Sequence, residues 1–257
     1  MIDAVWTNLI LNPMVNSLLL IYQFLFHNFG LAIIVFTAII RLITMPLTLR
    51  QQRSMEKMQE MQRSKRWQDI EKKHKGDRAR IQQEQMKLYR EAGVSPFGGC
   101  LPLLLQFPII IGLYQSITRA LPVVPQALLD LTKHIYPFVP ASLIPLNSHF
   151  LWWNLSQPER VVAPELFGFG IPLLTILVVA TSFLQTRMTT TPSGDSQGAQ
   201  MSKMMSLYMP FLFGFFAYSY AAGLALYFVT TNVMTIAQYA ALGKVDWRSL
   251  LSLRGTS

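Results

Sequence analysis

A single arginine interrupts an apolar stretch of the sequence that is long enough to cross a membrane. The stretch LAIIVFTAIIRLITMPLTL occupies residues 31–49, and Arg41 is the eleventh of its nineteen residues. A helix of this length spans roughly 30 Å, the thickness of the hydrocarbon core of a bilayer. Arg41 is therefore expected near the middle of the membrane, where a charged side chain is costly and marks a candidate functional site.

Hydrogen-bonding side chains recur in the other apolar stretches. Thr37 precedes Arg41 by one helical turn and shares its face. The remaining polar residues of interest are Gln106, Gln185, Thr230, Thr231, Asn232 and Gln238. Taken singly, each is better explained by a hydrogen bond between two helices. Together with a central arginine, they indicate a hydrated cavity.

The sequence lacks the residue patterns of catalytic, nucleotide-binding and metal sites. No GxxxxGKS, GxxxxGKT, HExxH or paired-cysteine spacing occurs, and the four histidines are scattered over loops and segment ends. The single cysteine, Cys100, rules out an internal disulfide and a multi-cysteine metal site. We therefore expect neither an enzyme nor a bound cofactor or metal.

The composition is that of an all-α polytopic membrane protein. The 257 residues are 51% hydrophobic and 14% charged, whereas a soluble domain has about 25% charged residues. Lys, Arg, Asp and Glu are absent from residues 4–40, 92–118, 166–186 and 204–243. Hydropathy and length predict five transmembrane helices, at residues 30–49, 99–118, 166–186, 204–220 and 223–243.

Basic residues predict the orientation of these helices. Short loops rich in Lys and Arg stay in the cytoplasm, and 13 of the 22 Lys and Arg residues lie between Arg50 and Arg90. The N-terminus is then outside and the C-terminus in the cytoplasm. The segments predicted to be cytoplasmic are 50–95, 187–203 and 244–257, and the external loop is 119–165.

Two external segments carry features of the membrane surface. Residues 1–29 are apolar, but asparagines and Pro13 interrupt residues 4–27, which favours an interfacial helix over a sixth span. Charge bias leaves that choice open. In the external loop, Trp152 and Trp153 are interpreted as interfacial anchors, since tryptophan prefers the headgroup level.

The 50–95 segment has the pattern of a helical hairpin. Methionines recur on one helical face, and the charged run KKHKGDRAR places a glycine between two helical stretches. The hairpin either merely connects two spans or recruits a substrate. We expect it to bury little and to be mobile. The candidate recruitment residues are Met55, Met58, Met61 and Gly76.

Several long stretches resemble the YidC/Oxa-type membrane protein insertases. The matching stretches are RLITMPLTLRQQRSMEKMQEMQ (41–62), EQMKLYREAGVSPFGGCLPLLLQFPIIIGLYQSI (84–117), FLQ (183–185), MMSLYMPFLFGFF (204–216) and GLALYFVTTNVMTIAQ (223–238). They follow the order and spacing of the family. The sequence departs from the family in lacking a large extracytoplasmic domain and a lipidated N-terminal cysteine, and in having Asn154 where Asp is commoner.

The resemblance implies five spans around a hydrophilic groove that opens to the cytoplasm and the lipid and is closed to the outside. Arg41 corresponds to the groove arginine, and an aromatic pair belongs to the groove wall. The expected groove residues are Arg41, Thr37, Gln185, Gln106, Tyr227, Phe228 and Thr231. The implied partners are nascent membrane proteins, membrane lipids, the Sec translocon and the ribosome, with no nucleic-acid binding of its own. A monomer in the bacterial plasma membrane is expected.

The leading hypothesis is therefore a membrane protein insertase and chaperone for small membrane proteins. A wet groove with one positive charge would shorten the dry path that a polar or acidic segment must cross. An alternative is a small-molecule or ion transporter with Arg41 as an anion site. The spans contain no acidic residue and no paired broken helices, which disfavours it. A purely structural scaffold is the third possibility.

Overall fold

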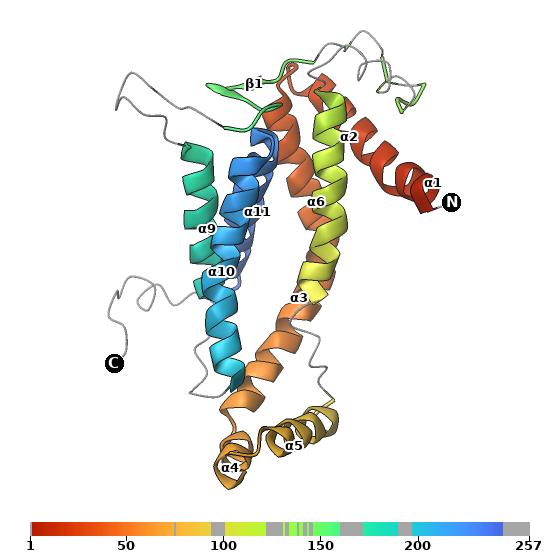
Figure 1. The fold of residues 1–257 in the computed structure, drawn as a ribbon. Coiled ribbons are helices and arrows are strands. Elements are labelled where there is room, and N and C mark those ends of the chain that lie inside the picture. Colours follow the sequence, from red (N-terminus) through yellow and green to blue (C-terminus); the bar gives the residue numbers. More distant parts are fainter. Residues whose placement is uncertain are drawn as a thin grey trace.

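The described part of the protein is almost entirely helical. The computed structural model describes residues 2–74, 76–93, 101–121, 146–159, 172–189 and 197–243, together with positions 131, 134–137, 139–140 and 143. Within these residues one two-stranded hairpin accompanies the helices (Figure 1). The all-α class is confirmed in this coarse form. Cys100 and the 244–257 tail lie outside the described residues.

The N-terminal residues form a tilted helical arm. Helix α1 (Ile2–Trp6), the π-helical turn η1 (Thr7–Leu11) and α2 (Asn12–Phe24) follow one another without a break. This arm packs on α3 (Phe29–Arg63) and α6 (Leu101–Ala120). By length and composition, the arm and α3 are the two described helices that could cross a membrane. The interfacial position of the arm stays a prediction.

Helix α3 is continuous through the predicted boundary between the first span and the cytoplasmic loop. It begins after Asn28, whose side chain accepts the Leu31 N–H at 3.1 Å. It includes Pro46 and ends at Arg63. Residues 50–63 are rich in Gln, Glu, Met, Lys and Arg, which favour helix, so nothing ends the helix at residue 49.

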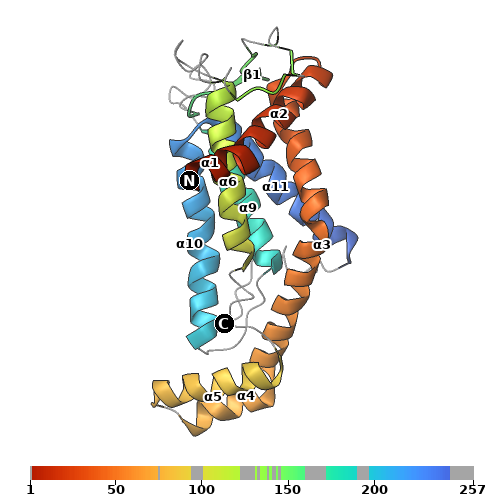
Figure 2. The same ribbon diagram turned by 90° about the vertical axis from the view of Figure 1, so that its right-hand side faces the viewer.

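The remainder of the predicted hairpin consists of α4 (Lys65–Lys73) and α5 (Arg78–Glu91). These two helices lie across the end of α3 (Figure 2). They share a small core in which the rings of Trp67 and Tyr89 are buried with their centroids 5.5 Å apart. We expected this region to bury little, but these two aromatic residues form a small buried core.

A short segment closes one end of the bundle. Strands β1 (His149–Phe150) and β2 (Trp153–Asn154) pair antiparallel. The chain after them binds the start of α11 (Ala222–Ala241): the Ala222 N–H donates to the Gln157 carbonyl at 2.8 Å, and the Gly223 N–H to the Leu155 carbonyl at 3.1 Å. A Cβ at Gly223 would lie 3.2 Å from that Leu155 oxygen. The close approach therefore favours glycine, because a Cβ there would force its neighbours to shift by a few tenths of an ångström.

Helix α11 connects two groups of helices. Helices α9 (Leu173–Thr189) and α10 (Gln197–Ser219) pack on each other and on α11. On its other side α11 packs on α3 and α6 (Figure 1). At the end near β1, the rings of Tyr114 and Tyr220 also bring α6 into contact with the segment after α10.

Burial divides the bundle into two halves. The capped half lies beneath β1 and β2 and consists of residues 29–37 of α3, 112–120 of α6 and 221–228 around the start of α11. The open half points toward α4 and α5 and consists of residues 38–50, 106–111 and 229–241 of the same helices. In α3, six of the nine capped residues are buried, whereas none from 38 to 50 is. In α6, five of the nine capped residues are buried and none from 106 to 111 is. In α11, residues 221–228 are all buried, whereas only four of the thirteen from 229 to 241 are: Thr231, Asn232, Thr235 and Tyr239.

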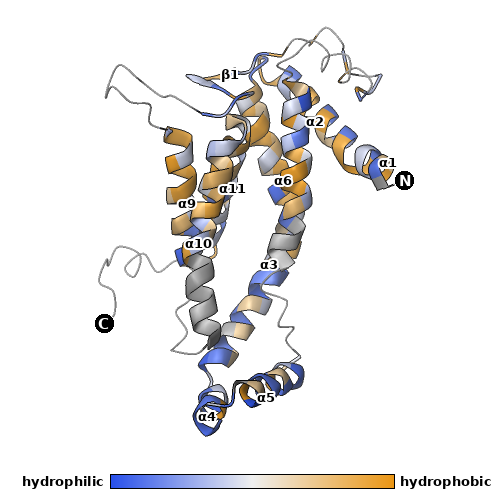
Figure 3. Ribbon diagram, viewed as in Figure 1, coloured by the Kyte–Doolittle hydropathy of each residue, from blue (hydrophilic) through white to orange (hydrophobic). Residues whose placement is uncertain are grey.

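Hydropathy does not distinguish the two halves. The described bundle helices are largely apolar along their length, whereas α4, α5 and the end of α3 are hydrophilic (Figure 3). The difference in burial therefore reflects which chain segments cover each half.

Candidate functional site

Arg41 is half-buried in the open half, on the side of α3 that meets α11. Its Nη2 donates to the Thr231 carbonyl at 3.4 Å, which is long for such a bond. The same carbonyl accepts a bond from Thr235 Oγ1 at 2.8 Å. In the part of the chain that the structure describes, the ion pairs are Arg66–Glu91 and Lys87–Glu84. The charge of Arg41 is therefore not neutralised by any described carboxylate.

Thr37 is satisfied within its own helix. Its Oγ1 donates to the Ile33 carbonyl at 2.6 Å, and the residue is 1% exposed. Between the described atoms of Thr37 and Arg41 there is no hydrogen bond. Thr37 is therefore the last buried residue of α3 in the capped half, one helical turn before Arg41.

The predicted aromatic pair connects α11 to helices on both of its sides. Tyr227 Oη accepts a short hydrogen bond from Gln106 Nε2 of α6. The ring of Phe228 lies against Phe213 of α10, with 5.1 Å between centroids. Both Tyr227 and Phe228 are buried. Two of the predicted groove residues, Gln106 and Tyr227, are thus brought together directly.

The polar residues shared by α9 and α11 serve mainly to join the two helices. Asn232 Nδ2 donates to Thr181 Oγ1 at 3.0 Å and to Ser182 Oγ at 2.8 Å. The interhelical explanation is therefore correct for Asn232. Thr231 is buried beside it, and Gln185 is half-buried in the last turns of α9.

One face of α3 carries hydrogen-bonding groups from Arg41 toward its C-terminal end. Thr44, Thr48 and Gln51 follow Arg41 at intervals of three or four residues. Gln51 Nε2, the neighbouring Gln52 Oε1 and Gln238 Nε2 of α11 are buried and have no hydrogen-bond partner among the described residues. Buried amide atoms of this kind require a partner, and water can supply it.

The recruitment candidates in residues 50–95 differ in their contacts. Met58 and Met61 pack against the Trp67–Tyr89 core. Met55 is half-buried outside that core. Gly76 is exposed, has φ of 103° and has open space where a Cβ would be. Two of the three methionines therefore contribute to packing.

The sequence analysis did not identify a buried carboxylate in the segment that it predicted to be external. Glu159 is 5% exposed, and its Oε1 accepts a bond from Trp153 Nε1 at 2.7 Å. Its Oε2 accepts the N–H of Thr175 at the start of α9 at 3.2 Å. The interpretation of Trp153 as an interfacial anchor is wrong, because its indole is buried and bonded to this carboxylate. Trp152 is 60% exposed.

Comparisons with known proteins agree on one family. Residues 20–246 match the family described as 60Kd inner membrane protein. The membrane protein insertase YidC of Syntrophobacter fumaroxidans is 34% identical over 244 residues, covering 92% of this chain and 38% of the relative. The YidC of Prosthecochloris aestuarii is 35% identical over 220 residues, covering 82% and 32%.

A solved structure extends the similarity to the fold. It is described as an active YidC insertase with the first transmembrane domain resolved. It is 28% identical, with a TM-score of 0.54, and the match covers 92% of this chain and 46% of that chain. The present chain thus spans less than half of the length of these relatives.

Proposed function

The chain belongs to the 60Kd inner membrane protein family, and from this membership we propose that it is a membrane protein insertase and chaperone. Its substrates are nascent membrane proteins, which it inserts and helps to fold, alone or with the Sec translocon. Arg41 carries the proposal, because it is an uncompensated charge in the open half.

The proposed site is a hydrated groove in the open half, lined by Arg41, Gln106, Gln185 and Thr231, with Tyr227 and Phe228 in its wall. Support comes from the buried amide atoms of Gln51, Gln52 and Gln238. Further support comes from α3, in which no residue from 38 to 50 is buried.

Because the capped half is thin, the groove would shorten the distance that a polar segment must cross without water. Its part of α3 runs from Phe29 to Thr37, eight residue steps or roughly 12 Å of helix. The hydrocarbon core of a bilayer is roughly 30 Å thick. A polar segment that entered the open half would then have less than half of that distance to cross without water. Since dehydration of backbone and charge dominates the cost of crossing, the barrier falls accordingly.

The charge of Arg41 adds selectivity for acidic segments. A guanidinium that is not paired with a carboxylate can hold a substrate carboxylate temporarily. Release follows when the apolar helix of the substrate partitions into lipid. No step of this cycle uses a nucleotide.

The proposed topology has five spans with the N-terminus outside and the C-terminus in the cytoplasm. The N-terminal arm lies on the outer surface, the α4–α5 region in the cytoplasm, and the protein acts as a monomer that meets the ribosome. Cysteine labelling from each side, after replacement of Cys100, tests this topology. External labelling of an exposed position such as Arg53 would overturn it.

Reconstitution into protein-free liposomes tests the function. The purified chain should insert a small single-spanning protein supplied without Sec components or nucleotide. Liposomes without the chain, and with the chain after heat denaturation, are the controls. Flux of small anions without insertion would replace the insertase proposal by the transporter alternative.

A further inference from the structure

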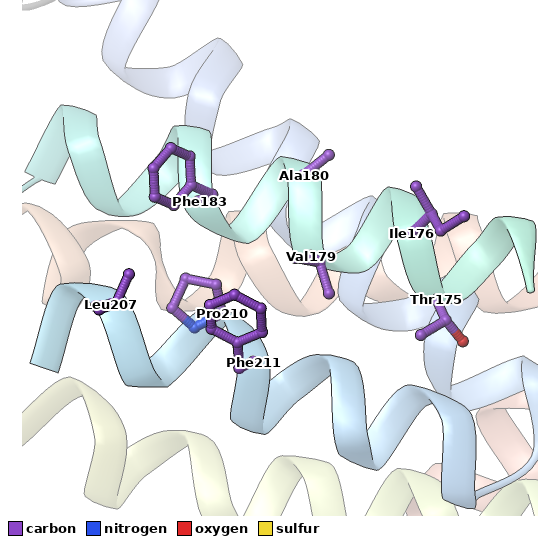
Figure 4. Close-up of a pocket in the computed structure, with 8 residues that line it drawn as sticks. All are labelled: Thr175, Ile176, Val179, Ala180, Phe183, Leu207, Pro210 and Phe211. Carbon is purple, nitrogen blue, oxygen red and sulfur yellow. The ribbon is translucent and has the colours of Figure 1, made fainter.

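An apolar groove lies between α9 and α10, on a side of these helices that the insertase site does not use. Its cavity has a volume of about 420 Å³. Val179 and Thr175 point from α9 toward α10, and Pro210 and Leu207 point back toward α9 (Figure 4). The remaining lining residues are Ile176, Ala180, Phe183 and Phe211.

Small residues create this groove. A Cβ at Gly214 would approach Val179 Cγ2 within 2.5 Å, so the two helices are very close at that point. Beside it, Ala180 and Pro210 have too little side chain to fill the space between the helices. The result is a depression that is open to the surroundings of the bundle.

A cation stands at one end of the groove. The Arg187 guanidinium carbon lies 4.6 Å from the ring centroid of Phe183, which itself lines the groove. This cation–π contact holds the guanidinium over the rim, and the residue is exposed. In the described residues Arg187 has no carboxylate partner. Its donors are therefore free to bind an anion at that rim.

The distance from the groove to the cation matches one leaflet of a bilayer. Thr175, at the far end, and Arg187 are twelve residues apart on α9, or roughly 18 Å along the helix. Half of the hydrocarbon core is roughly 15 Å. A molecule with its anionic group at Arg187 and an extended apolar chain in the groove would therefore span one leaflet.

We propose that this groove is a binding site for one anionic phospholipid, with an acyl chain between α9 and α10 and the headgroup phosphate on Arg187. The lining supplies apolar contact for the chain, and the guanidinium supplies charge-assisted hydrogen bonds to the phosphate. A transmembrane helix of a partner protein fits less well. A helix about 10 Å across and 12 Å long occupies on the order of 900 Å³, more than twice the volume of the groove.

Native mass spectrometry of the full chain in detergent tests the site, with phosphatidylglycerol and phosphatidylcholine as the two probes. A discrete adduct with one phosphatidylglycerol is expected, with phosphatidylcholine bound more weakly. Arg187→Gln removes the headgroup partner and Ala180→Phe fills the groove, so each should weaken the adduct roughly tenfold. Because the readout is lipid binding, it is independent of insertion activity.

Two matched control variants distinguish lipid binding at this groove from general attraction of lipids to the protein. Arg53→Gln removes an exposed charge of α3, and Ala237→Phe adds the same bulk to an exposed position of α11. Both should bind phosphatidylglycerol as the unmodified chain does. Equal binding of the two lipids would overturn the proposal, as would equal weakening by Arg53→Gln and Arg187→Gln. Unchanged binding in Ala180→Phe, together with loss of a co-purifying membrane protein, would instead identify a helix-docking groove.

Discussion

The capped and open halves of the bundle are built from the same helices and differ in what covers them. In the capped half, Ile33, Leu113 and Leu224 are almost completely buried, covered by the N-terminal arm as well as by the 149–159 segment. In the open half, Arg41 is half-buried and Ile43 is 68% exposed. This difference shows that segments outside the bundle helices, rather than the hydropathy of those helices, decide where the bundle is closed.

The two halves should respond differently to substitution. Changes in the capped half should lower stability, since its side chains and backbone are fully engaged. Changes at Arg41 in the open half should leave stability largely intact and alter function, because its one hydrogen bond to another helix is long.

The largest loss of stability is expected from Glu159→Ala in the capping segment. The substitution leaves the buried Trp153 Nε1 and the part-buried Thr175 N–H without an acceptor. Each orphaned donor costs about 1–3 kcal/mol. The midpoint of thermal unfolding in detergent should fall, and Glu159→Gln, which keeps one acceptor, should fall less. An unchanged midpoint for Glu159→Ala would mean that the capping segment does not stabilise the bundle.

A somewhat smaller loss is expected from Gly30→Ala at the start of α3. An added Cβ would overlap the side chain of Phe150 in β1. Overpacking of this kind costs about 1–3 kcal/mol. The same unfolding measurement should show partial recovery when Phe150→Ala is combined with Gly30→Ala. Independent, additive losses in the double variant would contradict the contact.

Asn232→Ala should have a weak effect at the border between the two halves. It removes the bonds to Thr181 and Ser182 that join α11 to α9. Hydrogen bonds between membrane helices contribute about 0.6 kcal/mol on average. Val233→Ala, at the exposed neighbouring position, is the control. A loss of several kcal/mol in Asn232→Ala would show that the open half also depends on tight packing.

The smallest effect on stability is expected from Arg41→Ala in the open half. No described carboxylate loses a partner, and the single bond to the Thr231 carbonyl is long. Arg41→Ala also removes a half-buried charge that no described carboxylate neutralises. The unfolding midpoint should be unchanged or higher. A marked drop would mean that Arg41 is a structural residue.

The sequence was sufficient to predict the helical class and the lack of a carboxylate partner for Arg41 among the described residues. Both depend on local properties: the length of the apolar stretches, and the absence of acidic residues from them.

Contacts between distant residues could not be predicted in the same way. Nothing near Glu159 indicates that the loop folds back to bury its carboxylate against Trp153. The Trp67–Tyr89 core joins residues in two helices, and its apolar signal is hidden by the surrounding charge. The continuity of α3 past residue 49 could not be predicted from hydropathy, because a fall in hydropathy marks the end of an apolar stretch and not the end of a helix.

The central claim is that Arg41 acts as an accessible positive charge for acidic substrate segments, and a matched insertion assay tests it most directly. Arg41→Ala and Arg41→Lys are reconstituted into liposomes at equal protein levels and given two substrates that differ only in an Asp or Asn in the translocated segment. We expect Arg41→Ala to lose most insertion of the Asp substrate and least of the Asn substrate, and Arg41→Lys to retain much of both. Equal insertion of the two substrates by Arg41→Ala, at the level of the unmodified chain, would contradict the claim.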